Sequence, residues 1–128
     1  MAGKSRYTFT ILTSAKIYKH ALVVITAAGK AKPADNETTT TFVGLAEQEC
    51  DTGDGTVTCT VITDLDVKLP LVTAITVGDT NRTKLYAADD NTGTAEATLG
   101  PEIGVMVEFV AANSGWVRLR QQPIVVAS

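Results

Sequence analysis

Hydrophobic and polar residues alternate over short stretches of this chain, which is the pattern of half-buried β-strands. In the stretch "YTFTIL", Tyr7, Phe9 and Ile11 fall on one side of an extended chain, and Thr8 and Thr10 fall on the other. Helical periodicity is not sustained, and only the stretch 13–21 is compatible with a helical turn. The abundance of Val, Ile and Thr also favours strands. The pattern predicts an all-β fold.

Residues that favour turns divide the rest of the chain into further short strands. Loops rich in Gly, Pro, Asp and Asn occupy 27–37, 77–81, 89–94 and 111–114. The strands expected between and beyond them are 20–26, 41–50, 55–63, 65–72, 83–88, 102–110, 115–120 and 123–128. Pro70 marks 65–72 as an edge strand or a strand end. Many short strands separated by turns are typical of a small β-barrel or a β-clip-like sandwich.

The chain resembles itself at a constant offset of 60 residues. The coinciding pairs are Ala27/Ala87, Ala28/Ala88, Thr38/Thr98, Gly44/Gly104, Gly55/Gly115 and Val57/Val117. Strands and turns follow in the same order in both halves, so we expect two similar β units related by a pseudo-twofold arrangement; the general likeness of β-hairpins is the other explanation. The length of 128 residues fits one β domain, 18–128, preceded by an extended N-terminal arm, 1–17.

The stretch "ECDTGDGTVTC" places two cysteines around a turn. Asp54-Gly55 is a strong signal for a two-residue hairpin turn, and such a turn sets Cys50 opposite Cys59. The pair falls at a position where the two backbones are closest. Two interpretations stay open: two small apolar side chains in contact, or a cross-strand disulfide formed in an oxidising medium. At the offset of 60, Val110 and Leu119 would form the corresponding apolar pair.

No set of residues has the composition or spacing of a metal site or an active site. Two cysteines and the single histidine, His20, do not provide the four ligands of a structural zinc site. Asp51, Asp54 and Asp64 do not follow the spacing of a calcium-binding loop. The sequence contains no nucleophile elbow and no phosphate-binding glycine pattern. We therefore expect no enzymatic activity, no metal and no cofactor.

Charge is distributed unevenly along the chain. Residues 1–32 contain six basic residues and no acidic one, and all fourteen acidic residues follow them. A basic leading segment suggests contact with an acidic surface, on its own body, on a sister subunit or on a partner. The net charge of −3, without a basic stripe, argues against nucleic acid. The sequence shows no apolar run long enough for a membrane helix and no apolar core typical of a secretory signal.

Four motifs follow one another along the chain: "VGLAE" at 43–47, "ITVGD" at 75–79, "LYAAD" at 85–89 and "IGVMVE" at 103–108. Their order resembles the small capsid cement, or head decoration, proteins of tailed bacteriophages, over about residues 18–120. Two features depart from that family. Extra residues separate Asp79 from the strand of Tyr86, and the leading segment is longer and more basic than the pattern needs.

The resemblance implies a β-barrel-like module on the exterior of an icosahedral capsid. Members of this family commonly act as trimers that bridge neighbouring capsomers. The implied partners are the major capsid protein and other copies of the chain, with no nucleic acid or membrane. The implied location is the virion, assembled in the host cytoplasm, and no catalytic residue is required.

Two regions are candidates for contact with the capsid or a sister subunit. The first is the leading arm with Arg6, Tyr7, Phe9 and Ile11, which could add a strand to a neighbour's sheet; it could equally be the first strand of the protein's own barrel. The second is Trp116, either an interface anchor or a cover for its own barrel end. The alternative functions are a fibre or cell-surface module recognising a glycan or receptor, and a small β-barrel enzyme such as a nucleotide hydrolase.

Overall fold

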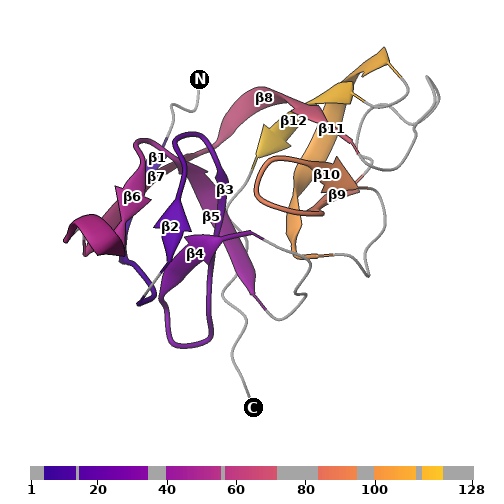
Figure 1. The fold of residues 1–128 in the computed structure, drawn as a ribbon. Helices are drawn as coiled ribbons and strands as arrows, with labels where there is room; N and C mark the ends of the chain where they lie inside the picture. The colour runs from indigo at the N-terminus through magenta and orange to yellow at the C-terminus, as the bar shows by residue number, and fades with distance from the viewer. Residues whose placement is uncertain are drawn as a thin grey trace.

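The computed structural model consists of strands and turns, and the all-β prediction is confirmed. It describes residues 5–13, 15–34, 40–55, 57–71, 84–94, 100–111 and 114–119. The predicted strand 123–128 lies outside these residues. Two five-stranded antiparallel sheets lie side by side, the first built by the indigo-to-magenta half of the chain and the second by the other half (Figure 1). Within the described ranges, no α-helix is present, and so none long and apolar enough to cross a membrane.

The first sheet has the strand order β1-β7-β5-β3-β4. Its strands are β1 (Ser5–Thr10), β3 (Leu22–Ile25), β4 (Ala31–Pro33), β5 (Thr41–Ala46) and β7 (Thr58–Thr63). A separate two-stranded ribbon pairs β2 (Lys16–Ile17) with β6 (Cys50–Asp51). The stretch 13–21 therefore contains a strand and a turn instead of a helical turn, since Lys16 and Ile17 pair with β6.

The second sheet repeats this arrangement. Its strands are β8 (Leu65–Pro70), β9 (Lys84–Ala87), β10 (Gly93–Thr94), β11 (Glu102–Ala111) and β12 (Ser114–Leu119). Starting from β8, the order is β8-β12-β11-β9-β10, which matches β1-β7-β5-β3-β4 strand for strand in both chain order and position. In each unit, a parallel β-bridge joins the residue that follows the outermost strand to the short strand at the other edge of the sheet. Ile11, after β1, bridges to Ala31 of β4, and Leu71, after β8, bridges to Gly93 of β10. The expectation of two similar β units is supported.

The registers show which residues are equivalent and correct the uniform offset. The offset of 60 holds for β1/β8 and β5/β11, but it is 62 for β3/β9 and β4/β10 and 56 for β7/β12. Equivalent connections in the two units differ in length by two or four residues. An alignment of the two halves at one fixed offset cannot follow these differences. Gly44 and Gly104 are equivalent, as expected. Val117 instead matches Val61, and Gly115 matches Cys59.

Gly44 and Gly104 are required where the central strand of each sheet crosses close to its neighbour. Their φ angles are 149° and 157°, in a region of backbone conformation that residues other than glycine avoid. A Cβ atom on Gly44 would lie 2.6 Å from the carbonyl oxygen of Ile62, and one on Gly104 would lie 2.0 Å from that of Arg118. On its other side, the central strand shows a register shift against β3 or β9 at the same place in both units. The two motif glycines therefore serve the fold.

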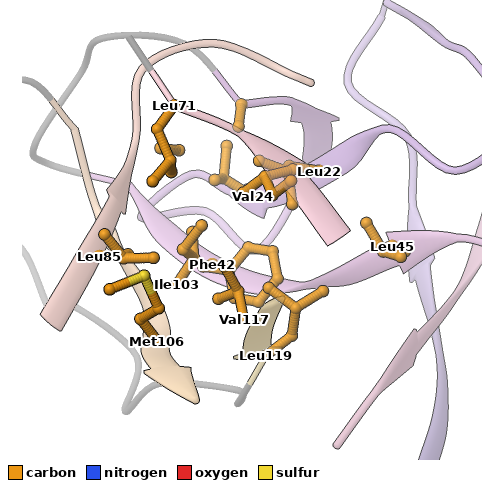
Figure 2. Packing of buried hydrophobic residues seen from close by; sticks show 13 residues of the cluster. Leu22, Val24, Phe42, Leu45, Leu71, Leu85, Ile103, Met106, Val117 and Leu119 are labelled. Atoms are coloured by element: carbon orange, nitrogen blue, oxygen red, sulfur yellow. The ribbon is translucent and has the colours of Figure 1, made fainter. Parts of the chain in front are cut away.

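The main core lies between the two sheets. One face of the first sheet presents Leu22, Val24, Phe42 and Leu45 to the second sheet. The facing residues of the second sheet are Leu69, Leu71, Leu85, Ala87, Ile103, Met106, Val117 and Leu119. In Figure 2, the ring of Phe42 lies beside Val117 and Leu119. The first unit thereby covers what we call the inner face of the second sheet.

A second core covers the equivalent inner face of the first sheet. The sheet contributes Val23, Ile25, Val43, Val61 and Cys59, which correspond to Leu85, Ala87, Ile103, Val117 and Gly115 of the second unit. Ile17 and Cys50 of the β2–β6 ribbon lie in the same buried cluster, so the ribbon covers this face. The two inner faces are thus alike, but one is covered by a ribbon of its own unit and the other by the neighbouring unit.

The predicted hairpin at Asp54-Gly55 is wrong. Cys50 is paired with Ile17, and Cys59 is paired with Phe9. Residues Thr52–Asp54 form a 3-10 turn, in which the carboxylate of Asp51 accepts a hydrogen bond of 2.8 Å from the backbone N–H of Gly53. This local cap competes with a two-residue hairpin turn, and the strand before it pairs with β2 instead of β7.

Candidate docking surface at the edge of the first sheet

The leading segment forms the first strand of the protein's own first sheet. The segment is extended, but β1 pairs antiparallel with β7 from Ser5↔Thr63 to Thr10↔Thr58 and forms an edge of the first sheet. Ile11 is 5% exposed and Ile17 is fully buried, so both belong to the second core. The candidate surface is therefore an edge strand packed on its own body.

The hydrogen-bonding pattern shows which backbone groups of β1 face outward. The N–H of Ile11 donates to the carbonyl of Val57 at 3.0 Å, so odd-numbered residues of this strand bond to β7. The carbonyl of Thr60, the partner of Thr8, instead accepts from Glu47 on the far side. Because the two kinds of pair alternate, the N–H and C=O groups of Arg6, Thr8 and Thr10 point away from β7. At the end of the strand, this side meets β4, since Ile11 bridges to Ala31. The outer edge of the first sheet is therefore the row of backbone groups of Arg6 and Thr8.

β1 differs from the other three edge strands of the two five-stranded sheets. β4 has three residues and ends at Pro33, and β10 has only two residues. β8, the equivalent of β1, carries Asp66, Lys68 and Pro70 at the positions of the outward groups. Proline and charge at these positions block pairing with another strand. β1 has six residues with no proline and one charged side chain, so it is the edge most suited to accept a strand.

The candidate residues on β1 lie in different environments. Arg6 forms an ion pair with Glu47 while keeping an exposed side chain. Tyr7 is 42% exposed, Phe9 is half-buried against the second core, and Ile11 is buried. Of these four side chains, Arg6 and Tyr7 are the most accessible to a partner. The sequence reasoning did not identify the outward backbone groups of Arg6 and Thr8; the contrast between 5–10 and the charged, proline-containing 65–70 was the available signal.

An apolar hollow lies at the end of β1. It measures about 360 Å³, and its lining residues are Thr10, Ile11, Leu12, Thr13, Lys30, Thr52, Gly55 and Val57. Leu12 and Val57 are exposed hydrophobic residues, and Lys30 adds a positive charge. A strand paired with β1 would pass this hollow, which is large enough to hold an apolar side chain.

Trp116 lies on a different surface. It is 37% exposed on β12 of the second sheet, and its backbone is paired with Lys68. The neighbouring pair is Arg118 and Asp66, which form two hydrogen bonds of 2.9 and 3.2 Å. The hydrogen bonds and charge of Asp66 raise the pKa of Arg118. Trp116 and the β1 edge therefore do not form one continuous sheet face.

The two cysteines are free thiols inside the second core. Cys50 is 5% exposed and Cys59 is 1% exposed. Burial, a hydrogen bond with Cys50 and the charge of Cys50 together raise the pKa of Cys59 to about 12. The structure therefore brings the two side chains together, although by a route that differs from the predicted hairpin.

The remaining polar candidates serve local structure. Asp51 caps the 3-10 turn, and Asp64 has a positive φ of 61° with its N–H bonded to Leu119. His20 has a φ of 66° and donates its N–H to Ala46; it borders a cleft of about 390 Å³ between the two units. In the described part of the chain, no three His, Cys, Asp or Glu residues are grouped as metal ligands would be.

Comparison of the chain with protein-family models and with curated proteins finds no match.

Proposed function

We propose that this chain is a structural virion protein that decorates the exterior of an icosahedral phage capsid. It stabilises the capsid by bridging capsomers as a homotrimer, with the major capsid protein as its partner. The proposal assigns no catalytic step, metal or cofactor to the chain. It is supported by the order of the four motifs and by the open edge of β1.

The open edge carries the proposal because it gives the protein a way to bind an extended segment of the shell. The outward N–H and C=O groups of Arg6 and Thr8 match the spacing of an added strand, which would end where Ile11 bridges to Ala31 of β4. An apolar side chain of that strand would enter the hollow between Leu12 and Val57. An acidic residue beside it would meet Lys30. The expected partner is therefore an extended segment that combines apolar and acidic residues.

Binding of this kind stabilises a shell by linkage. A protein that binds the assembled lattice more tightly than its free subunits shifts the equilibrium toward the lattice. Three sites held in one trimer act together, so contacts that are weak singly give tight binding overall. Seams between capsomers are the places where such bridging has the largest effect.

Substitution of Thr8 tests the proposal on shells of the phage whose genome encodes the chain. Proline at position 8 removes an outward N–H and leaves the bonds of β1 to β7 in place, so the protein should fold. We expect the unmodified chain to co-sediment with the shells and to raise their melting temperature. Thr8→Pro should weaken that binding at least tenfold, or about 1.4 kcal/mol.

The matched control is Thr8→Val, which loses the hydroxyl bond to Thr60 but keeps the backbone N–H. It should bind shells like the unmodified chain. Failure of the unmodified chain to bind shells would reject the proposed function, and equal binding by Thr8→Pro would reject the β1 edge as the contact. Size-exclusion chromatography with light scattering tests the trimer separately.

The exposed Trp116 favours one alternative, a fibre or cell-surface module. An exposed tryptophan beside Lys68 and the Arg118–Asp66 pair is a surface on which a sugar ring could stack. This alternative predicts that Trp116→Ala abolishes binding to a glycan array or to host cells. Capsid decoration by the β1 edge predicts that the same variant still binds shells.

A further inference from the structure

Two thiols from different layers of the first unit meet in its interior. Cys50 belongs to β6 of the ribbon and Cys59 to β7 of the sheet. Both are buried in the cluster that joins the ribbon to the sheet, and burial together with the neighbouring Cys50 raises the pKa of Cys59. Each thiol donates to a nearby backbone carbonyl, Cys50 to Gln48 at 3.3 Å and Cys59 to Thr60 at 4.0 Å. The interior thus holds two free thiols close together in one apolar cluster.

The pairing of strands does not by itself bring Cys50 close to Cys59. In register, Cys50 is paired with Ile17 and Cys59 with Phe9, so the cysteines are not cross-strand partners. They meet because the ribbon lies over the inner face of the first sheet, where Cys59 points inward. A covalent bond between them would therefore connect the cover to the sheet that it protects.

The second unit contains no cysteine. The equivalent of Cys59 is Gly115, and the chain from Met106 to Val117 is four residues shorter than the equivalent chain from Ala46 to Val61. The inner face of the second sheet is covered by Phe42 and its neighbours from the first unit. The paired thiols therefore occur only in the unit that is covered by a short ribbon with two residues in each strand.

We propose that Cys50 and Cys59 form an intramolecular disulfide when the protein meets an oxidising medium, and that this bond fastens the β2–β6 ribbon to the first sheet. With hydrogen peroxide as oxidant, one sulfur is first oxidised to a sulfenic acid with release of water. The second sulfur then displaces a further water molecule and forms the S–S bond. The two thiols lose two electrons and two protons in total, and the peroxide is reduced to two water molecules.

The rate of this reaction is limited by the burial of the thiols. The thiolate is the reactive form of cysteine, and the raised pKa keeps Cys59 protonated near neutral pH. Oxidation of the folded protein should therefore be slow and should need either a small oxidant or transient opening of the ribbon. The bond would form over long exposure after the protein leaves a reducing compartment. The inference is independent of the proposed function, since it requires no capsid.

The experiment compares the reduced and oxidised forms of the full chain. After incubation with hydrogen peroxide or with glutathione disulfide, a titration of free thiols in denaturant should detect none, whereas the reduced chain should show two. The mass should fall by that of two hydrogens, and a digest should give one linked peptide pair. The protein should stay the same size on a non-reducing gel. Closing a loop of about ten residues should raise the melting temperature by about 5–10 °C.

The control variants are Cys50→Ala and Cys59→Ala, whose melting temperatures should not rise on oxidation. The oxidised and reduced forms of the unmodified chain can be compared even if a variant folds poorly. Two thiols that persist after long oxidation, disulfides formed mainly between chains, or a melting temperature that stays equal or falls on oxidation would each overturn the proposal.

Discussion

The two β units share a fold but differ in what covers the inner face of each sheet. Their strand orders are the same, and the central glycines Gly44 and Gly104 are equivalent. The first unit covers its inner face with the β2–β6 ribbon, whereas the second is covered by the first unit. The comparison shows that a repeated backbone does not need a repeated core, because any apolar surface of suitable shape can cover a sheet.

The units also differ at their outermost strands. β8 carries Asp66, Lys68 and Pro70, while the equivalent β1 carries Arg6, Thr8 and Thr10. Since the two strands have the same place and register, the fold does not require this difference. The second unit has proline and charged residues that block strand pairing at this edge, and the first unit does not. We interpret the unprotected copy as the one available for binding.

The largest expected effect tests the equivalence of the two central glycines. Gly104→Ala should lower the free energy of unfolding by more than about 4 kcal/mol, because its Cβ would lie 2.0 Å from the carbonyl oxygen of Arg118 at a φ that side chains avoid. Gly44→Ala should cost somewhat less, since the corresponding distance is 2.6 Å. Urea denaturation measures both values.

Gly29→Ala is the control for this pair. Its φ is also positive, at 81°, but a Cβ there would meet no atom within 4 Å. The expected cost is about 1 kcal/mol, from backbone strain alone. Equal costs at positions 29 and 104 would show that the close approach of the strands is unimportant.

The next effect tests whether the second unit depends on the first. Phe42→Ala removes the largest side chain that the first unit buries against the second sheet, and it should cost about 3–5 kcal/mol. Val43→Ala, one residue along on the opposite face, should cost about 2 kcal/mol because it removes less apolar surface. We expect one cooperative unfolding transition in both variants, and two separate transitions would show that the units are stable independently.

The repeat shows how much of this fold could be predicted from the sequence. Alternation identified the strands of "YTFTIL" and "GWVRLR", and Gly44 and Gly104 marked the equivalent strands correctly. Alternation depends on neighbouring residues only, so it identifies a strand without identifying its partner. The pairing of Cys50 with Ile17, across 33 positions, could not be obtained from that pattern.

The candidate surface shows the same limit. Sequence reasoning named residues of β1, which lies at an edge of the first sheet, and among them Ile11, which is buried. Whether a strand lies at an edge depends on the strand order, and Ile11 is buried by contacts with residues distant in sequence. The uniform offset failed for a related reason, because Cys59 and Gly115 become equivalent only after loops of different length are accounted for.

An effect that depends on pH tests the thiols of the first unit. The pKa of Cys59 is raised to about 12 from a usual value near 9, so folding favours the protonated form. Its contribution to stability is complete below about pH 9 and is lost as pH rises from 9 to 12. In this range, the folding equilibrium should fall by up to about tenfold per pH unit. Reduced Cys59→Ala should show a flatter dependence when unfolding is followed by circular dichroism. A steeper decline in that variant than in the unmodified chain would contradict the assignment.

The smallest expected effect concerns another equivalent pair, Thr63 and Leu119. Thr63 is fully buried, and its hydroxyl has no hydrogen-bond partner in the described structure, whereas the second unit has Leu119 at this position. Valine has nearly the shape of threonine without the hydroxyl, so Thr63→Val should raise the free energy of unfolding by about 1 kcal/mol.

The matched control is Thr60→Val on the same strand, where the hydroxyl lies within 3.2 Å of the Thr8 hydroxyl at the surface and the change should be within about 0.5 kcal/mol. A loss of stability in Thr63→Val would mean that the hydroxyl has a partner, such as a buried water, and that the first unit has a polar site where the second has none. A gain would instead show that the hydroxyl of Thr63 is buried without a partner and that this position favours an apolar side chain, as the equivalent position of the second unit has with Leu119.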